Sequence, residues 1–138
     1  MNDQRNAMNQ QVIDEFRTTG GKPGGMYASI PLLLLHHAGA KSGTAYVTPL
    51  AYLPDGDRWV LFAANGGRPN HPGWYFNLKA DPSAVIEIGT ETIKVVTKDA
   101  VGAEREALYE RERQVSSLFS DFEKRTTRQI PVVILERA

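Results

Sequence analysis

The sequence predicts a mainly β domain of the α+β class, a small antiparallel β-barrel with flanking helices. Three observations lead to this fold class. Short apolar runs with strand character recur through the middle of the chain, bounded by turn-forming residues. Two of these boundaries have the composition of hairpin turns, and sequential hairpins make antiparallel sheets. Apolar residues at helical spacing occur in a few separate segments, which suits helices that flank a barrel.

The first expected element is an amphipathic helix over residues 2–18. Its apolar side chains recur at spacings of four, with one more beside them: Met8, Val12, Phe16 and Ile13. Gly20-Gly21 ends the helix, and the glycines and proline that follow predict a hinge loop. We therefore expect an N-terminal helix and hinge over residues 1–25 and a barrel domain over residues 26–138.

The first half of the barrel is expected to contain three strands. The apolar run after Ile30 is continuous and short, as in a fully buried strand. Pro49 lies inside the second strand and removes a ladder donor, so this strand is expected at a sheet edge or at a bulge. Pro54-Asp55-Gly56-Asp57 predicts a hairpin turn. The expected strand ranges are 31–37, 46–53 and 58–64.

The second half begins with a short helix, which we expect to start at Pro72 and to end at Asp81-Pro82, with His71 or Asn70 as its cap. Two alternating strands are then joined at Gly89-Thr90, and a densely charged helical segment follows. The expected ranges are helix 72–80, strands 84–88 and 91–97, helices within 103–122 divided at Ser116-Ser117, and a last strand at 131–135.

Composition excludes several classes of function. The chain has no cysteine, which rules out disulfides, thiolate metal ligands and a cysteine nucleophile. Sixteen basic and sixteen acidic residues give zero net charge, which disfavours nucleic-acid binding. The longest apolar run, residues 30–35, is shorter than the core of a secretory signal or a membrane span. We expect a cytoplasmic protein, and weak peripheral association with the inner face of a membrane stays open.

Residues 39–43, GAKSG, are the first candidate binding site. The two glycines let backbone amides approach a ligand, Lys41 adds a positive charge and Ser42 adds a hydroxyl, a combination that suits a phosphate. The spacing differs from that of a Walker A loop, and a strand rather than a helix follows. The alternative interpretation is a plain surface turn.

Residues 65–74, NGGRPNHPGW, are the second candidate. A glycine pair allows the backbone to approach a flat ligand, and the following helix begins with free amides and the positive end of its dipole. Trp74 adds an aromatic surface. The alternative interpretation is a connecting loop in which Trp74 anchors the core.

The histidines do not predict a metal site, and none is expected. His36 and His37 are neighbours on a strand and point to opposite faces, while His71 is distant in sequence. We expect one of the pair to be a hydrogen-bonded core residue and the other to be exposed. No Gly-x-Ser-x-Gly elbow is present, and no catalytic residue is assigned.

Two charged segments are interpreted as solvated surface. The first is the helical stretch 104–113, with expected ion pairs between Glu106 or Glu110 and the neighbouring arginines. The second is a small basic cluster: Lys124, Arg125 and Arg128. Contact with an acidic cofactor tail or with a membrane is the alternative for this cluster.

Five segments together resemble one protein family. They read LLLLHHAGAKSG, YVTPLAYL, VLFAANGG, HPGWYFNLKADP and RTTRQIPVVILE. The pattern is similar to that of the deazaflavin (F420)-dependent nitroreductases and F420H2-dependent quinone reductases, and HPGWYFNLKADP is its most specific part. The resemblance covers about residues 28–136.

The resemblance implies a split β-barrel of the FMN-binding or flavin-reductase type that binds coenzyme F420. It implies an oxidoreductase that transfers a hydride from the reduced deazaflavin to a quinone, an enone or a nitroaromatic acceptor. The cofactor phosphate is then expected at Lys41, Ser42 and Gly43. The deazaflavin ring is expected against Thr48, Pro49, Ala63, Ala64, Asn65, Gly66, Gly67, Trp74 and Asn77.

The chain departs from the family pattern on both sides of the site. Ala40 stands where the family has an arginine before its lysine, and Tyr46 stands where a second arginine is often found. Some relatives have tyrosines where this chain has Ser116, Phe119 and Phe122. The expected acceptor pocket is therefore apolar and suits a small hydrophobic electron acceptor, with these residues: Tyr27, Tyr46, Phe119 and Phe122. Core packing is the alternative for the two phenylalanines.

Three further questions stay open at this point. FMN or FAD on the same barrel is an alternative to F420. A non-catalytic protein that binds a cofactor or a lipophilic ligand is an alternative from another functional class. A homodimer is a further expectation, because small split barrels often pair.

Overall fold

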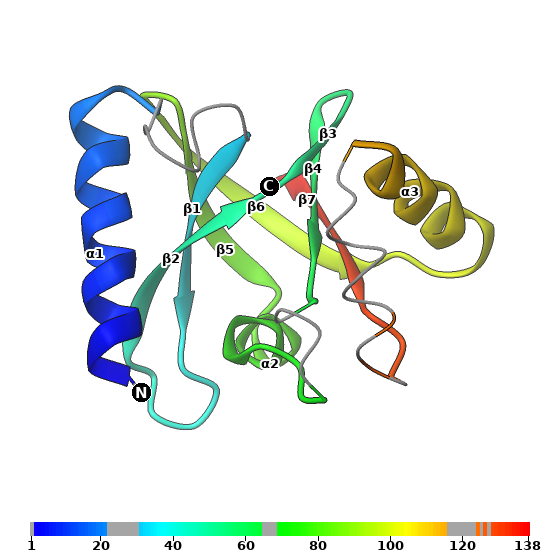
Figure 1. Ribbon diagram of the computed structural model, residues 1–138, viewed down its shortest axis with the longest axis horizontal. Coiled ribbons are helices and arrows are strands. Elements are labelled where there is room, and N and C mark those ends of the chain that lie inside the picture. The colour runs from blue at the N-terminus through cyan, green and yellow to red at the C-terminus, as the bar shows by residue number, and fades with distance from the viewer. Residues whose placement is uncertain (1, 22–30, 65–68, 116–123, 125, 127) are drawn as a thin grey trace.

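Seven strands form one antiparallel sheet in the order β2-β1-β5-β6-β7-β4-β3, as the computed structural model shows (Figure 1). The structure describes residues 2–21, 31–64, 69–115, 124, 126 and 128–138. The strands are β1 (Leu32–Ala38), β2 (Ala45–Ala51), β3 (Leu53–Asp55), β4 (Arg58–Phe62), β5 (Ser83–Ile88), β6 (Glu91–Asp99) and β7 (Val132–Arg137). The helices are α1 (Asn2–Thr18), α2 (Gly73–Ala80) and α3 (Gly102–Val115).

The sheet curls into a split barrel because β2 and β3 form its two opposite edges with Tyr52 alone between them. The expected single strand over 46–53 was therefore wrong. Pairing of β2 with β1 ends at Ala51 and pairing with β4 begins at Leu53, and the Tyr52 amide between them donates to the carbonyl of Pro31, the residue before β1, at 3.1 Å. The edge position expected from Pro49 is confirmed, as are the mainly β class and the split barrel.

The inside of the curled sheet holds the largest apolar cluster, and α2 closes it at one end (Figure 1). Leu33 and Leu35 of β1 point into this cluster, where Trp74 and Leu78 of α2 pack against them. Alternation along a strand sends the neighbouring residues to the outer face. The inner cluster therefore fixes where α2 lies relative to β1.

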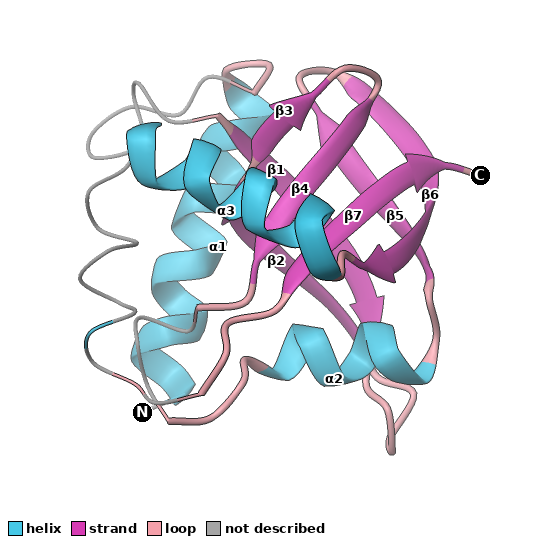
Figure 2. Ribbon diagram, turned by 90° about the vertical axis from the view of Figure 1, so that its right-hand side faces the viewer, coloured by secondary structure: helices cyan, strands magenta, loops and turns pink. Residues whose placement is uncertain are grey.

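Two helices cover the outside of the barrel on different sides (Figures 1 and 2). Ile13 and Phe16 of α1 pack on Leu32 and Leu34 of β1. Leu108 and Tyr109 of α3 belong to the cluster that covers the outer faces of β4 and β7: Val60, Phe62, Val132 and Ile134. The apolar runs in β1 and β7 are continuous because both faces of these strands are buried.

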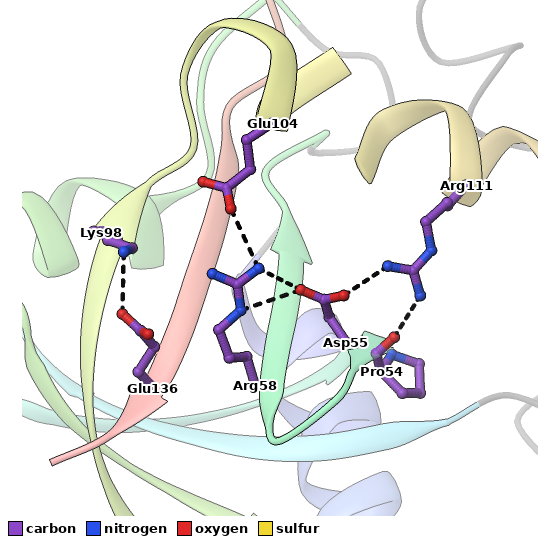
Figure 3. Close-up of polar contacts among 7 residues, drawn as sticks. All are labelled: Pro54, Asp55, Arg58, Lys98, Glu104, Arg111 and Glu136. Atoms are coloured by element: carbon purple, nitrogen blue, oxygen red, sulfur yellow. Dashed lines mark hydrogen bonds and ion pairs between the residues drawn. The ribbon is translucent and has the colours of Figure 1, made fainter. Parts of the chain in front are cut away.

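The β3–β4 hairpin is bound to α3 by a cluster of charged residues (Figure 3). Asp55 accepts from Arg58 Nε at 3.1 Å and from Arg111 Nη1 at 2.8 Å, and Arg111 also donates to the Pro54 carbonyl at 2.9 Å. Arg111 therefore pairs with the hairpin and not with Glu106 or Glu110 of its own helix, while its side chain is exposed, as expected for a solvated face. The expected pair between Glu110 and Arg113 is confirmed at 3.3 Å.

Several other expected boundaries shift by a residue or so. Pro72 is the N-cap of α2 with an extended backbone (φ −67°, ψ 154°), so the helix begins one residue later than expected. The two hairpins, the end of α1 before Gly20-Gly21 and the last strand are confirmed. The expected helix beyond residue 115 lies outside the described residues. Among those described, no helix has both the length and the apolar character to cross a bilayer.

Candidate functional site

The GAKSG turn joins β1 to β2 and closes on itself through backbone hydrogen bonds. The Gly39 amide donates to the Thr44 carbonyl at 2.8 Å, and the Gly43 amide donates to the Gly39 carbonyl at 2.9 Å. Gly43 has φ +70°, a left-handed conformation that favours glycine, which explains this residue at the end of the turn. The Thr44 amide donates to Ser42 Oγ at 3.2 Å.

The turn keeps donors for an anion at its tip. Within the part of the chain that the structure describes, the amides of Lys41 and Ser42 have no hydrogen-bond partner. Both side chains are exposed. Two backbone amides, one hydroxyl and one ammonium group form a donor set that fits a phosphate. This set has fewer amides than the sequence suggested, because those of Gly39, Ala40, Gly43 and Thr44 are already bonded.

Asn77 ties α2 to this turn. Its Oδ1 accepts from the Ala40 amide at 2.9 Å, and its Nδ2 lies 2.9 Å from His37 Nδ1. Trp74 and Leu78 are buried in the barrel interior, and they orient α2 so that Asn77 faces the turn. The GAKSG turn and the HPGWYFNLKADP motif are therefore joined through one amide side chain.

His37 continues this connection to β2. Its Nε2 lies 2.9 Å from Thr48 Oγ1, and its ring stacks on Tyr46 with a centroid distance of 5.5 Å. Burial is the main cause that lowers the pKa of His37 to about 4, with the neighbouring His36 as a second cause. The imidazole is therefore neutral near pH 7.

His36 faces the other side of β1, as predicted. Its Nε2 lies 2.6 Å from Glu87 Oε2, and Glu87 also receives two bonds from Arg17 of α1, at 2.7 and 3.2 Å. The expectation of one bonded and one merely exposed histidine was wrong, because both side chains are hydrogen-bonded and partly buried. This outer cluster fastens α1 to the sheet.

A cavity of about 290 Å³ opens beside the stacked rings of His37 and Tyr46. Its wall also includes residues from β5 and from the end of α2: Asp81, Ser83, Ala84 and Val85. Tyr46 is 47% exposed and is one of the residues that line this cavity. The role of Tyr46 in an acceptor pocket stays a prediction.

Ala63 and Ala64 lie at the end of β4, and both are buried. The guanidinium of Arg128 donates to their carbonyls, at 3.1 Å to Ala63 and at 2.7 Å to Ala64. Arg128 Nη1 also lies 2.8 Å from His71 Nδ1, and burial together with the arginine charge lowers the pKa of His71. Arg128 is thus a partly buried structural cation, contrary to its interpretation as solvated surface.

Sequence reasoning missed the parts played by His37 and Arg128. Strand alternation could have placed His37 on the inner face beside Leu33 and Leu35, but its partners on β2 and α2 depend on tertiary packing. Trp74 is buried in the core, with 7% of its surface exposed, and its expected contact with the cofactor ring stays a prediction. The remaining expected site residues lie outside the described part of the chain: Tyr27, Asn65, Gly66, Gly67, Phe119 and Phe122.

The described residues contain no group of three or more His, Asp or Glu that could hold a metal ion. The polar groups near the turn belong to Lys41 and Ser42, to the hydroxyl of Thr48 and to the side chain of Asn77 on α2. These groups suit an organic cofactor that carries a phosphate and a flat ring.

Comparison with known proteins identifies similar chains. Residues 8–137 match the family model of F420H(2)-dependent quinone reductases. An F420H(2)-dependent quinone reductase of Mycobacterium tuberculosis is 37% identical over 128 residues, which cover 88% of this chain and 85% of that protein. The family match over residues 8–137 includes the turn, β2, the end of β4 and α2.

Solved structures agree with this result. The structure of an F420-H2 dependent reductase (FDR-A) superposes with a TM-score of 0.70 and 32% identity, and covers 77% of this chain and 94% of that chain. A domain-swapped dimer superposes with a TM-score of 0.72 and 28% identity, over 99% of this chain and 100% of that chain. The similarity therefore extends over the whole barrel.

Proposed function

Because this chain belongs to the family of F420H2-dependent quinone reductases, and is an oxidoreductase that uses coenzyme F420, we propose that its cofactor site lies at the GAKSG turn, β2 and α2. The single observation that carries this proposal is the Asn77 side chain. It bonds to Ala40 in the turn and to His37, which in turn bonds to Thr48 on β2. Three segments that are distant in sequence thus form one hydrogen-bonded unit.

The tip of the turn is proposed to hold the cofactor phosphate. Lys41 supplies the positive charge, and the amides of Lys41 and Ser42 with the Ser42 hydroxyl supply directed donors. Gly43 allows the left-handed backbone of the turn (φ +70°), and the space beside it is open. An exposed charge contact of this kind contributes about 1 kcal/mol or less to binding.

The deazaflavin ring is proposed to lie against β2 and the segment directly after β4. The residues expected to contact it there are Thr48, Pro49, Ala63 and Ala64. Trp74, Asn77 and the segment Asn65, Gly66, Gly67 complete this proposed surface. When bound, F420H2 supplies a hydride and a proton that reduce a quinone to a quinol and leaves as F420. The protein binds and orients both molecules and excludes water.

The acceptor is proposed to be a hydrophobic quinone that enters beside Tyr46. The partly exposed Tyr46 side chain lines the 290 Å³ cavity, which supports stacking of a flat ring on it. Tyr27, Phe119 and Phe122 are proposed to complete an apolar lining. An enone or a nitroaromatic acceptor would use the same surface.

A fluorescence titration with F420 tests the proposed site, with FMN as the competing flavin. We expect Lys41→Ala to weaken F420 binding by up to about fivefold and Ala40→Arg to tighten it by a similar factor. Lys94→Ala is the matched control, since this exposed lysine lies on β6. Equal dissociation constants for wild type, Lys41→Ala and Ala40→Arg would show that the turn does not hold the phosphate.

We also propose that the protein forms a homodimer and associates weakly with membranes that contain its quinone. The dimer is supported by the similar solved structure of a domain-swapped dimer. Sedimentation analysis at several concentrations should show a dimer, and a monomer at all of them would refute it. Flotation with anionic vesicles tests the membrane association, and protein that stays entirely at the bottom of the gradient would contradict it.

A further inference from the structure

The backbone amide of Ala40 determines the direction of a chain of hydrogen bonds across the site. A backbone N–H can only donate, so the Asn77 atom that lies 2.9 Å from it must be the carbonyl oxygen Oδ1. This contact fixes the orientation of the Asn77 amide, which its own atoms would leave ambiguous. The NH2 group of Asn77 therefore points toward His37.

The Asn77 NH2 group determines the tautomer of His37 in the same way. It donates to His37 Nδ1 at 2.9 Å, so Nδ1 must be unprotonated. A neutral imidazole then carries its proton on Nε2, which lies 2.9 Å from Thr48 Oγ1. His37 is consequently the donor and Thr48 the acceptor in this bond.

The surroundings of His37 keep the ring in this state. The ring is partly buried between β1, β2 and α2 and stacks on Tyr46 with an angle of 24° between the planes. Its pKa of about 4 means that protonation does not reverse the bonds near neutral pH. The donor direction therefore stays the same near neutral pH.

Thr48 receives the last bond of this chain. Its hydroxyl has one proton, and the lone pair facing His37 is already occupied. In the described part of the structure, Thr48 Oγ1 has no second hydrogen-bond partner. The Thr48 proton is therefore available for a group that is not part of this chain.

We propose that His37 is a positioning residue that makes the Thr48 hydroxyl a hydrogen-bond donor toward the bound cofactor. This inference rests on the proposed cofactor site. The matching ligand atom is an acceptor without a proton, such as a carbonyl oxygen of the flat heterocyclic ring. A ligand with an N–H group at the same place would bind less well. One lone pair of Thr48 Oγ1 is already used by His37, and the Thr48 hydroxyl proton occupies the position of the N–H group.

The direction of the bonds is tested first on the free protein. Nitrogen-15 chemical shifts of the His37 ring distinguish the two neutral tautomers, and we expect the proton on Nε2 between pH 6 and pH 8. A proton on Nδ1 would overturn the proposal. This measurement requires neither a variant nor the cofactor.

A double-mutant cycle on F420 affinity tests the function of the bond. Thr48→Val keeps the shape but removes the hydroxyl, and we expect binding to weaken about threefold to tenfold, while Thr48→Ser stays near wild type. His37→Phe keeps a ring for Tyr46 and should weaken binding by a similar factor. In the Thr48→Val background, His37→Phe should have almost no further effect.

The outcomes separate the two proposals. Wild-type protein that fails to bind F420 refutes the proposed cofactor site, whatever the tautomer of His37. Wild-type protein that binds F420, with His37→Phe equally harmful in both backgrounds, leaves the site standing and overturns the positioning role. Thermal unfolding of each variant identifies any loss that comes from misfolding.

Discussion

Arg128 Nη2 donates to the carbonyl oxygen of Ala64 at 2.7 Å, across a sequence separation of 64 residues. The same guanidinium donates to the carbonyl of Ala63 and contacts His71, which directly precedes the cap of α2. One side chain thus connects the end of β4, the approach to α2 and the segment that leads into β7. Hydrogen bonds from a charged donor to buried carbonyls are among the stronger ones in proteins.

Replacing Arg128 should therefore affect both stability and the proposed site. We expect Arg128→Met to lower the free energy of unfolding by about 2 kcal/mol, because two carbonyls lose their charged donor. F420 affinity should also fall, since Ala63 and Ala64 belong to the proposed ring surface. Urea unfolding and F420 titration measure the two effects. Lys124→Met, an exposed neighbour, serves as the control, and equal unfolding midpoints for both variants would contradict the prediction.

Asp55 predicts a pH-dependent contribution to stability. Hydrogen bonds from Arg58 and Arg111 hold the pKa of this carboxyl below its usual value. A lowered pKa in the folded state stabilises the protein above about pH 4, the value of an unfolded Asp, and this stabilisation is lost as the pH falls through the folded pKa. Asp55→Asn should cost about 1 kcal/mol at pH 7.

Urea unfolding over a series of pH values tests this prediction. The gap between the free energies of unfolding of wild type and Asp55→Asn should narrow as the pH falls below about 4, the pKa of an unfolded Asp. Asp57→Asn changes an exposed carboxyl in the same turn and should leave stability nearly unchanged throughout. A gap for Asp55→Asn that is constant with pH would rule out the ion pairs as its cause.

Adding a single methyl group at Gly21 should strongly lower the free energy of unfolding. Gly21 has φ +92°, and a Cβ there would lie 2.5 Å from the Cα of Gly89 in the β5–β6 turn. Gly56 also has a positive φ, of +61°, but nothing lies within 4 Å of its Cβ position. Gly21→Ala should therefore lower the free energy of unfolding by at least about 2 kcal/mol more than Gly56→Ala. Similar losses in urea unfolding would show that the backbones can move apart.

Glu87 should contribute to the attachment of α1. Its carboxylate accepts two hydrogen bonds from Arg17 and contacts His36, and these partners lower its pKa. Because the Arg17 side chain is 47% exposed, we expect Glu87→Gln to cost about 1 kcal/mol or less. Amide hydrogen exchange should quicken in α1 more than in β6. Glu91→Gln at an exposed position is the control, and unchanged exchange in α1 would contradict the expected role.

Local signals were sufficient for most of the fold. The turns at Pro54–Asp57 and at Gly89-Thr90 were predicted because hairpins depend on a few adjacent residues. The division at Tyr52 was not, because it depends on closure of the sheet by pairings with strands far along the chain. A strand pattern shows which face is buried, but it does not show which edge of a sheet the strand joins.

Prediction of the site from the sequence has the same limit, because its contacts join residues that are far apart in the chain. The GAKSG turn and Asn77 belong to motifs with recognisable residue types, so the sequence singled them out. The bonds from Asn77 to His37 and from Arg128 to Ala64 join residues 40 and 64 positions apart, and no local pattern encodes them. His37 and Arg128 could therefore be assigned roles only once the packing of α2 and of the segment before β7 was known.

The position of β7 has a consequence for the order of events during synthesis. This strand pairs with β6 on one side and with β4 on the other, although its residues are translated after all the other strands. Until they emerge from the ribosome, β4 and β6 each present an unpaired backbone edge. The barrel can then close only when β7 inserts between β4 and β6. From the completion of β6 until β7 is available, the nascent protein consequently carries two exposed edges, and this is the period in which chaperones would have to protect it.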